Sequence, residues 1–328
     1  MKSSKKILSA IFAMALFAQV SAQEAVETVS ISIPRSLLSL YETTLQGESP
    51  QDHECYVHAQ DNIDLYPAHA DALSQGHPKG TVTEGRFTST KVYPGVNYHY
   101  WVYVPAQYDG SQDANFIVFQ DGGFYLSDDG DVSVPTVLDN LIAKGDIPVT
   151  IALFVAPGDK GPGLPIYGGT DNRSVEYDSV DDRYASFLIN ELMPAAVGKY
   201  RLSQNPADCC IYGLSSSGVS ALAVAWHRSN KFGGVISASG SFVNIRGGHV
   251  WPYAIRAHEK RPIKIYMTAG EKDLDIVFGH LLTANRAVAK ALEYRDYDHI
   301  YVEHRSGHTG KVMRHLLPDA LRWMWGGK

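Results

Sequence analysis

The chain has 328 residues, of which 45% are hydrophobic and 20% charged, so it is long and apolar enough to bury a full core. Its 29 basic and 35 acidic residues give a net charge of −6, which argues against nucleic acid or an anionic membrane as the main partner. Three cysteines are too few for a disulfide scaffold.

The first residues have the features of a secretory signal peptide. Three lysines precede an apolar run at residues 7–20, and a small-residue cleavage pattern ends at Ala22. The apolar run is too short to span a membrane, and no cysteine follows it to carry a lipid anchor. We expect residues 1–22 to be removed, with cleavage after Gln23 as the second choice. Loss of the three lysines takes the net charge from −6 to −9, and the mature protein is expected to be secreted or periplasmic.

Residues 23–85 show only weak patterns, and residues 48–85 have no sustained periodicity and are rich in Gln, Asp, His, Pro and Gly. We expect an irregular N-terminal extension that lies over the following domain. Four histidines in it follow no metal-ligand spacing, which favours surface histidines over a metal site: His53, His58, His69 and His77. Cys209 and Cys210 are expected to be small core residues, and a bond from Cys55 to one of them is possible but unsupported.

From residue 86 onward, strand and helix patterns alternate. Strands at 86–92 and 98–104, joined by a Pro-Gly turn, predict a hairpin. Short apolar runs bounded by turn residues predict six buried parallel strands, at 116–119, 149–155, 209–212, 235–238, 263–268 and 300–303. Helical patterns occur at 134–143, 181–200, 216–228, 280–294 and 311–325, with Pro194 expected to break or kink the second. This order predicts an α/β fold over residues 86–328, with a doubly wound, mostly parallel sheet of eight strands and helices on both faces.

The most informative stretch is Gly213-Leu214-Ser215-Ser216-Ser217, which lies between an apolar run and a small-residue helix pattern. A strand, a tight turn carrying a serine and a helix form the nucleophile elbow of α/β-hydrolases. Gly213 stands two residues before Ser215, as G-x-S-x-G requires, but Ser217 occupies the place of the second glycine. Taken alone, the stretch could equally be a serine-rich loop without chemistry. Ser216 is the poorer nucleophile candidate, because Leu214 would have to fit where the tight turn requires a small residue.

A nucleophilic serine needs a base and an orienting carboxylate, which α/β-hydrolases supply in the order serine, acid, histidine. The strand predicted at 263–268 is followed by Gly270-Glu271-Lys272-Asp273, which makes Asp273 the predicted acid and Asp275 the alternative. After the last strand, His308 lies between two glycines in the loop that opens the final helix. We predict His308 as the base and a structural role for His304, which lies at the strand end.

The oxyanion hole should combine the amide after the nucleophile, that of Ser216, with an amide from the loop after the third strand. That loop contains Gly122 and Gly123, and glycines let the backbone approach a substrate closely. The alternative is an ordinary turn at the end of a strand. The position of the loop, where the fold requires the second donor, favours a role in the oxyanion hole.

With these residues in place, the chain resembles the putative-esterase family of α/β-hydrolases. This family includes enterochelin esterases, feruloyl and acetyl-xylan esterases, esterase D and mycolyltransferases. The similarity runs from about residue 80 to residue 325, and its segments are Val118-Phe119-Gln120-Asp121-Gly122, Asn172-Arg173-Ser174-Val175-Glu176-Tyr177-Asp178, Glu191-Leu192-Met193-Pro194, the serine turn, residues 270–273 and Gly307-His308. The resemblance, greatest to the enterochelin-esterase branch, implies a serine esterase without metal or organic cofactor and supports Ser215, Asp273 and His308. It departs at Ser217, where the family has glycine.

The substrate side is less defined. Aromatic residues in loops beside the expected pocket could form a wall for a phenolic or sugar ester. These residues are Phe124, Tyr125, Trp251 and Tyr253, and His249 lies in the same loop as Trp251 and Tyr253. Plain loop packing is the equal alternative. Arg173 could bind a substrate carboxylate or phenolate, or pair with Glu176 or a nearby aspartate. A siderophore trilactone, a feruloylated polysaccharide and an acetylated sugar are all possible substrates. An acyltransferase with the same triad and an inactive binding protein on a hydrolase fold are the alternative functions.

Overall fold

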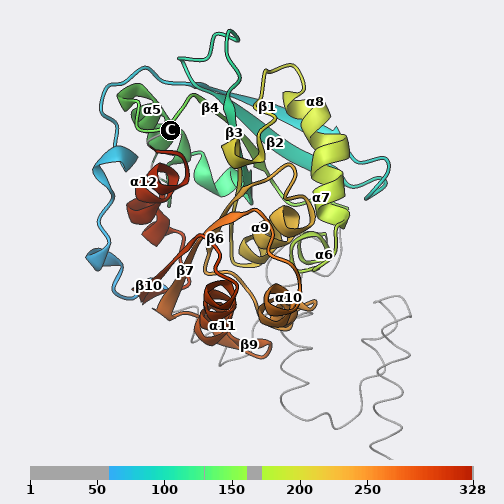
Figure 1. The fold of residues 1–328 in the computed structure, drawn as a ribbon. Coiled ribbons are helices and arrows are strands. Elements are labelled where there is room, and N and C mark those ends of the chain that lie inside the picture. The colour runs from blue at the N-terminus through green and yellow to red at the C-terminus, as the bar shows by residue number, and fades with distance from the viewer. Residues whose placement is uncertain (1–58, 129, 161–171, 327–328) are drawn as a thin grey trace, which may run out of the picture.

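The computed structural model describes residues 59–128, 130–160 and 172–326 (Figure 1). The predicted signal peptide, most of the predicted extension, two of its histidines and Cys55 lie outside the described residues. Cys209 and Cys210 are buried free thiols.

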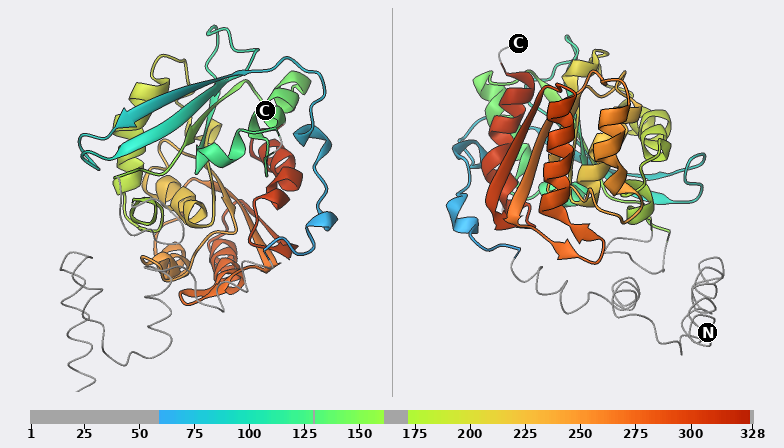
Figure 2. Two further views of the ribbon diagram at one scale, coloured as in Figure 1. Left: turned by 180° about the vertical axis from the view of Figure 1, so that it is seen from behind. Right: turned by 60° about the horizontal axis from the view of Figure 1, so that its bottom comes forward.

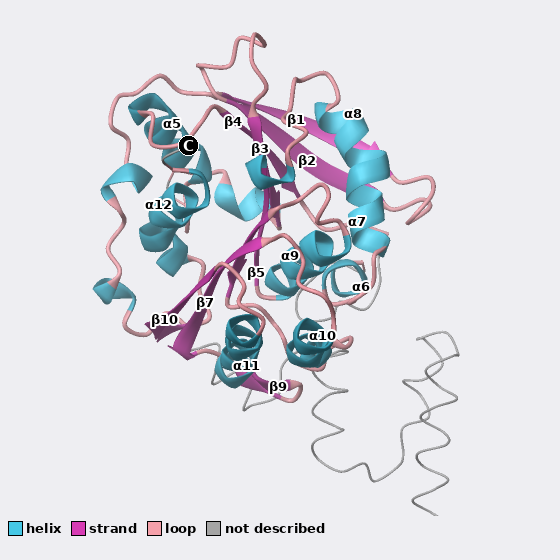
Figure 3. Cartoon of the chain, in the orientation of Figure 1, coloured by secondary structure: helices cyan, strands magenta, loops and turns pink. Residues whose placement is uncertain are grey.

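Eight strands form one sheet in the order β1-β2-β4-β3-β5-β6-β7-β10 (Figure 3). Their bounds are β1 (Thr81–Thr88), β2 (Asn97–Val104), β3 (Asn115–Gln120), β4 (Thr150–Val155), β5 (Cys209–Leu214), β6 (Gly234–Ala238), β7 (Lys264–Lys272) and β10 (His299–Gly307). Strand β2 is antiparallel to both neighbours, and the pairs from β4 to β10 are parallel. The strand order reverses at β3, with β4 on one side and β5 on the other. Ligands of open α/β sheets bind at the carboxyl ends of the strands at such a point.

Side chains that alternate along the strands build two hydrophobic layers. Phe116 and Val118 belong to one core cluster, and their neighbours Ile117 and Phe119 belong to the other. The helices are α5 (Val134–Lys144), α6 (Arg173–Tyr177), α7 (Arg183–Phe187), α8 (Met193–Val197), α9 (Ser216–His227), α10 (Trp251–Ala257), α11 (Leu281–Tyr294) and α12 (Lys311–Trp325). Helices α5 and α12 cover one face, and helices α6 to α11 cover the other (Figures 1 and 2). The predicted doubly wound α/β-hydrolase fold is thereby confirmed.

The described part of the predicted extension, from residue 59 to β1, is held by specific polar contacts. The buried carboxylate of Asp71 pairs with Lys144 of α5 and Arg322 of α12. The hydroxyl of Tyr66 accepts a hydrogen bond of 2.7 Å from the amide of Arg305 in β10. The segment therefore crosses α5, α12 and the edge strand β10 as an anchored part of the domain.

The first strand is shifted from its predicted position. It runs over Thr81–Thr88 instead of residues 86–92, and the chain turns after Thr88. The amides of Thr90, Lys91 and Val92 donate to the carboxylate of Glu191 at 2.8, 3.1 and 2.8 Å. A side chain about one hundred residues away in the sequence thus takes the backbone donors that the strand prediction assigned to a sheet.

The helical pattern at 181–200 contains the predicted break near Pro194. Helix α7 passes into a π-helical turn at Leu188–Leu192, and α8 begins at Met193. Proline lacks the amide that an α-helix would use, and a widened turn before it accommodates the loss. Three short elements were not predicted: α6, α10 and the small hairpin of β8 (Asp275–Ile276) and β9 (Gly279–His280). Among the described residues, no helix combines the length and the apolarity needed to cross a membrane.

Candidate active site

The serine turn joins the end of β5 to the start of α9 through one strained residue. Ser215 has φ 65° and ψ −125°, a conformation that non-glycine residues rarely adopt. Its amide donates to Ala238 O at 2.9 Å, which ties the turn to β6. A Cβ placed on Gly213 would lie 2.0 Å from the carbonyl oxygen of Ser217, so only glycine fits before the turn. These features have the geometry of a nucleophile elbow.

Ser217, the residue that departs from the motif, is fully buried and hydrogen bonded. Its Oγ accepts from the amide of Leu214 at 2.8 Å and lies 2.8 Å from Oδ2 of Asp121. The glycine that permits close packing of α9 against the loop after β6 is Gly218 instead. A Cβ there would lie 3.0 Å from Gly240 Cα.

The predicted acid and base are in direct contact. Nδ1 of His308 lies 2.7 Å from Oδ1 of Asp273, and the exposed fractions of the two side chains are 9% and 0%. Asp273 follows β7 and His308 follows β10, so neighbouring parallel strands deliver both side chains to the same edge of the sheet. The alternative acid, Asp275, is exposed and lies on the short strand β8.

The carboxyl of Asp273 is stabilised in its ionised form. Burial acts to raise its pKa, but the His308 ring, the Leu274 amide and the Ser239 hydroxyl outweigh burial and hold the pKa below its usual range. The carboxyl is therefore ionised at neutral pH. A carboxylate at Nδ1 favours the tautomer in which that nitrogen carries the proton, which leaves Nε2 as the basic nitrogen.

Ser215 lies at the same sheet edge, because β5, β7 and β10 are parallel parts of one sheet. Its Oγ is half-buried and lies 3.2 Å from Oγ of Ser241. The loop after His308 packs against the serine turn: a Cβ on Gly310 would lie 3.7 Å from Cδ1 of Leu214.

Sequence reasoning did not identify residues 239–241, the start of the loop after β6, as part of the site. This loop lies between the strands of the nucleophile and the acid. The amide of Ser241 donates to Ser215 O at 3.0 Å, and the Ser239 hydroxyl helps to lower the pKa of the Asp273 carboxyl. The side-chain amide of Asn285 in α11 holds this loop by donating to Gly240 O at 2.7 Å. The only available signal was its position, a Ser-Gly-Ser sequence directly after the sixth strand.

The loop predicted for the oxyanion hole begins with Asp121 in the left-handed region, at φ 58°, and continues as a 3-10 turn over Gly122–Tyr125. A Cβ on Gly122 would lie 2.4 Å from the backbone nitrogen of Val155, so the close approach to β4 requires glycine. The first amides of a helical turn have no acceptor within that turn. This holds for Gly122 here and for Ser216 at the start of α9.

A sequence model of the family described as putative esterase matches residues 92–324. The chain belongs to the putative-esterase family. A search of curated proteins found no match.

Solved structures similar to this family member include several esterases. A ferulic acid esterase matches with a TM-score of 0.60 at 18% identity, over 75% of this chain and 98% of that one. The enterobactin esterase of Shigella flexneri, solved with 2,3-di-hydroxy-N-benzoyl-glycine, matches with a TM-score of 0.62 at 20% identity, over 80% of this chain and 62% of that one. A feruloyl esterase module of Clostridium thermocellum, complexed with sinapinate, matches with a TM-score of 0.57 at 16% identity, over 79% and 93%. These identities show the shared fold, and the family supports ester hydrolysis.

The predicted aromatic wall of this family member is only partly at the surface. Tyr125 and Trp251 are buried, with 4% and 2% of their surfaces exposed, and each packs edge to face on another core aromatic ring. Phe124 and Tyr253 are 74% exposed, and His249 is exposed as well. The prediction for Tyr125 and Trp251 is therefore corrected. Both lie in short helical turns, where the sequence does not reveal which of several adjacent aromatic residues faces the core.

Arg173 forms an internal ion pair. Its guanidinium donates two hydrogen bonds to the carboxylate of Asp121, at 2.9 and 2.8 Å, and its side chain is 15% exposed. Of the partners considered from the sequence, the nearby aspartate is the one observed, and Glu176 is not. Glu176 accepts from the Tyr98 hydroxyl at 2.5 Å, and burial raises its pKa to about 7 despite hydrogen bonds from Tyr98, Gly158 and Asn172.

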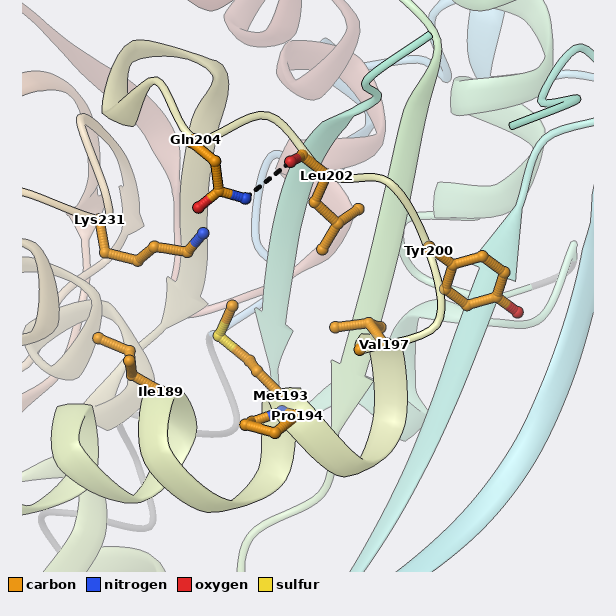
Figure 4. A pocket seen from close by; sticks show the side chains of 9 residues that line it. Ile189, Met193, Pro194, Val197, Tyr200, Leu202, Gln204 and Lys231 are labelled. Atoms are coloured by element: carbon orange, nitrogen blue, oxygen red, sulfur yellow. Dashed lines mark hydrogen bonds between the residues drawn. The ribbon is translucent and has the colours of Figure 1, made fainter. Parts of the chain in front are cut away.

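A shallow pocket of about 360 Å³ lies elsewhere on the molecule (Figure 4). Its lining is mostly apolar, with Gln204 and Lys231 as polar members. Gln204 precedes β5 and Lys231 precedes β6, so the pocket lies at the amino ends of the strands, opposite Ser215. It is not part of the candidate site. Within residues 59–128, 130–160 and 172–326, no group of three or more His, Cys, Asp or Glu side chains is arranged to hold a metal ion.

Proposed function

We propose that the protein is a serine carboxylic-ester hydrolase in which Ser215 is the nucleophile, His308 the general base and Asp273 the residue that orients the base. The observation that carries the proposal is the 2.7 Å contact between a buried carboxylate and His308, at the sheet edge where Ser215 takes its strained conformation. Three side chains in these roles form the nucleophile, base and orienting group of a serine acyl-transfer triad.

In the proposed reaction, Nε2 of His308 takes the proton of Ser215 as Oγ attacks the ester carbonyl. The negative charge that develops on the carbonyl oxygen is stabilised by the amides of Ser216 and of the Gly122–Gly123 segment. His308 then gives its proton to the leaving alcohol, and an acyl-enzyme remains. Water, activated by the same histidine, attacks the acyl carbon and regenerates Ser215.

For the substrate, we propose a siderophore trilactone or a feruloyl or acetyl ester of a plant polysaccharide. The similar solved structures include a ferulic acid esterase and an enterobactin esterase. The exposed rings of Phe124 and Tyr253 give the loops after β3 and β6 surfaces on which an aromatic acyl group can pack. The signal-peptide pattern of residues 1–22 supports a secreted or periplasmic location.

The test is hydrolysis of p-nitrophenyl acetate and methyl ferulate by the mature protein and its Ser215→Ala variant. We expect essentially complete loss of turnover in the variant. Ser203→Ala is a matched control, because Ser203 is a partly buried, hydrogen-bonded serine just before β5, at the opposite edge of the sheet. Equal turnover in wild type and Ser215→Ala contradicts the proposal. A panel of feruloyl, acetyl-xylan and siderophore esters then identifies the substrate.

A further inference from the structure

The two halves of the proposed oxyanion hole come from separate parts of the chain. The amide of Ser216 follows β5, and the amides of Gly122 and Gly123 follow β3. These strands are neighbours in the sheet, but the hydrogen-bonded pairing between them ends before the two loops begin. Donors in an oxyanion hole must be held to within a few tenths of an ångström of where the charge develops. A connection between the two loops is therefore of catalytic interest.

Ser217 provides such a connection. Its hydroxyl is completely buried and has two acceptors within reach, Asp121 Oδ2 at 2.8 Å and Leu214 O at 2.7 Å. A carboxylate is the stronger acceptor, so the proton points towards Asp121. The same oxygen accepts from the amide of Leu214. One side chain thus binds the residue before the nucleophile and the residue before Gly122.

Asp121 is held from its other side as well. Arg173 of α6 donates to both carboxylate oxygens, at 2.9 and 2.8 Å, in a forked pair. The carboxylate is 5% exposed, so water screens these contacts little. With its side chain fixed by Arg173 and Ser217, Asp121 has little freedom to move the adjoining Gly122 amide.

A space-filling role for Ser217 makes a different prediction. Glycine is the residue that the G-x-S-x-G pattern has at this place, and alanine is close to serine in volume, so either would satisfy packing alone. Both would leave the Leu214 amide and one oxygen of Asp121 without this buried partner. Removal of the hydroxyl alone therefore distinguishes a hydrogen-bonding role of Ser217 from a space-filling role.

We propose that Ser217, Asp121 and Arg173 form a hydrogen-bonded link that positions the Gly122 loop against the serine turn. Ser217 is then a positioning residue, and the serine at this place contributes to rate. The inference rests on the proposed esterase function. It leads to an unexpected outcome: restoring the glycine of the family pattern should slow this enzyme.

The experiment compares wild type, Ser217→Ala and Ser217→Gly on p-nitrophenyl acetate. We expect kcat and kcat/KM to fall together by about tenfold with KM within about twofold, as for loss of an interaction made only in the transition state. Complete removal of one oxyanion donor costs roughly 100-fold or more, and displacement should cost less. Ser237→Ala is the matched control, since Ser237 is equally buried and its Oγ donates to Gly218 O on the same helix at 2.9 Å. We expect it to keep the wild-type kcat.

Arg173→Lys is a second, independent variant, because it keeps the charge but loses the forked pair. We expect a smaller fall in kcat and, in combination with Ser217→Ala, a loss below the product of the two. The proposal is overturned if both Ser217 variants keep the wild-type kcat or if kcat falls as much in Ser237→Ala. It is also overturned if Arg173→Lys keeps the wild-type kcat. As a precondition of the test, the turnover of wild type must exceed that of Ser215→Ala. Equal inactivity of those two contradicts the esterase function itself.

Discussion

The two sides of the site differ in what fixes their residues. On the side of Ser215, Asp273 and His308, the backbone sets the requirements: a turn too tight for a side chain at Gly213, and strands that end at a common edge. In the loops after β3 and β6, by contrast, each side chain packs into the core or lies at the surface independently of its neighbour in the sequence. Tyr125 is buried while the adjacent Phe124 is 74% exposed. The spacing of residues in the sequence predicts positions that the backbone sets, but it does not predict which side chains of these loops are buried.

The largest effect is expected from loss of the charge on Asp273. Asp273→Asn keeps the shape of the side chain but removes the charge that orients His308, and we expect kcat/KM to fall by roughly 10³- to 10⁴-fold. The matched control is Asp275→Asn, at an exposed position two residues away on the short strand β8, which should keep wild-type kinetics. Steady-state hydrolysis of p-nitrophenyl acetate at neutral pH measures both. If Asp275→Asn carried the loss, Asp275 and not Asp273 would be the residue that orients His308.

The same reasoning explains which parts of the fold were predictable. The six parallel strands and four of the five predicted helices occur within a few residues of their predicted bounds, because periodic burial over long segments leaves a regular pattern. Helices α6 and α10 are too short, at five and seven residues, to establish such a pattern. The partners of Ser217 and Glu191 lie about one hundred residues away, and no local rule connects them.

The buried and exposed aromatic residues of α10 are expected to differ in their contribution to stability. Trp251 and Tyr253 are neighbours in α10, with 2% and 74% of their surfaces exposed. We expect Trp251→Ala to lower the free energy of unfolding by about 3–5 kcal/mol, because it leaves a cavity beside Trp226. Tyr253→Ala should change that free energy by no more than about 0.5 kcal/mol. Urea denaturation measures both variants, and equal destabilisation would refute the division between core and surface drawn here.

Tyr253→Ala has a further expected outcome, in substrate binding. If the exposed ring contacts an aromatic acyl group, KM for methyl ferulate should rise several-fold while KM for p-nitrophenyl acetate stays unchanged. An equal change in both KM values would show that the ring acts on the site in general. No change in either would remove Tyr253 from the substrate surface.

The remaining prediction concerns the turn that follows Thr88, where the sequence predicted a continuing strand. Glu191 is nearly buried and accepts from the amides of Thr90, Lys91 and Val92. Burial acts to raise its pKa, but these amides and the Ser89 hydroxyl lower it below the ordinary value of 4.5. A carboxyl whose pKa is lower in the folded protein stabilises the fold fully above the unfolded pKa, and this contribution is lost as pH falls through the folded pKa.

Glu191→Gln removes the charge and replaces one acceptor oxygen with a donor group that faces donors. At neutral pH we expect the variant to lose about 1–3 kcal/mol of unfolding free energy, the usual cost of leaving buried donors without their acceptor. The difference from wild type should shrink as the pH falls below the unfolded value near 4.5, since wild type then loses the same charge. Urea denaturation at neutral pH and at successive acidic values tests this, with Glu293→Gln, on the exposed end of α11, as the control. A difference that stays constant with pH would mean that shape and not charge holds the turn, and the strand prediction would then have failed for reasons of packing.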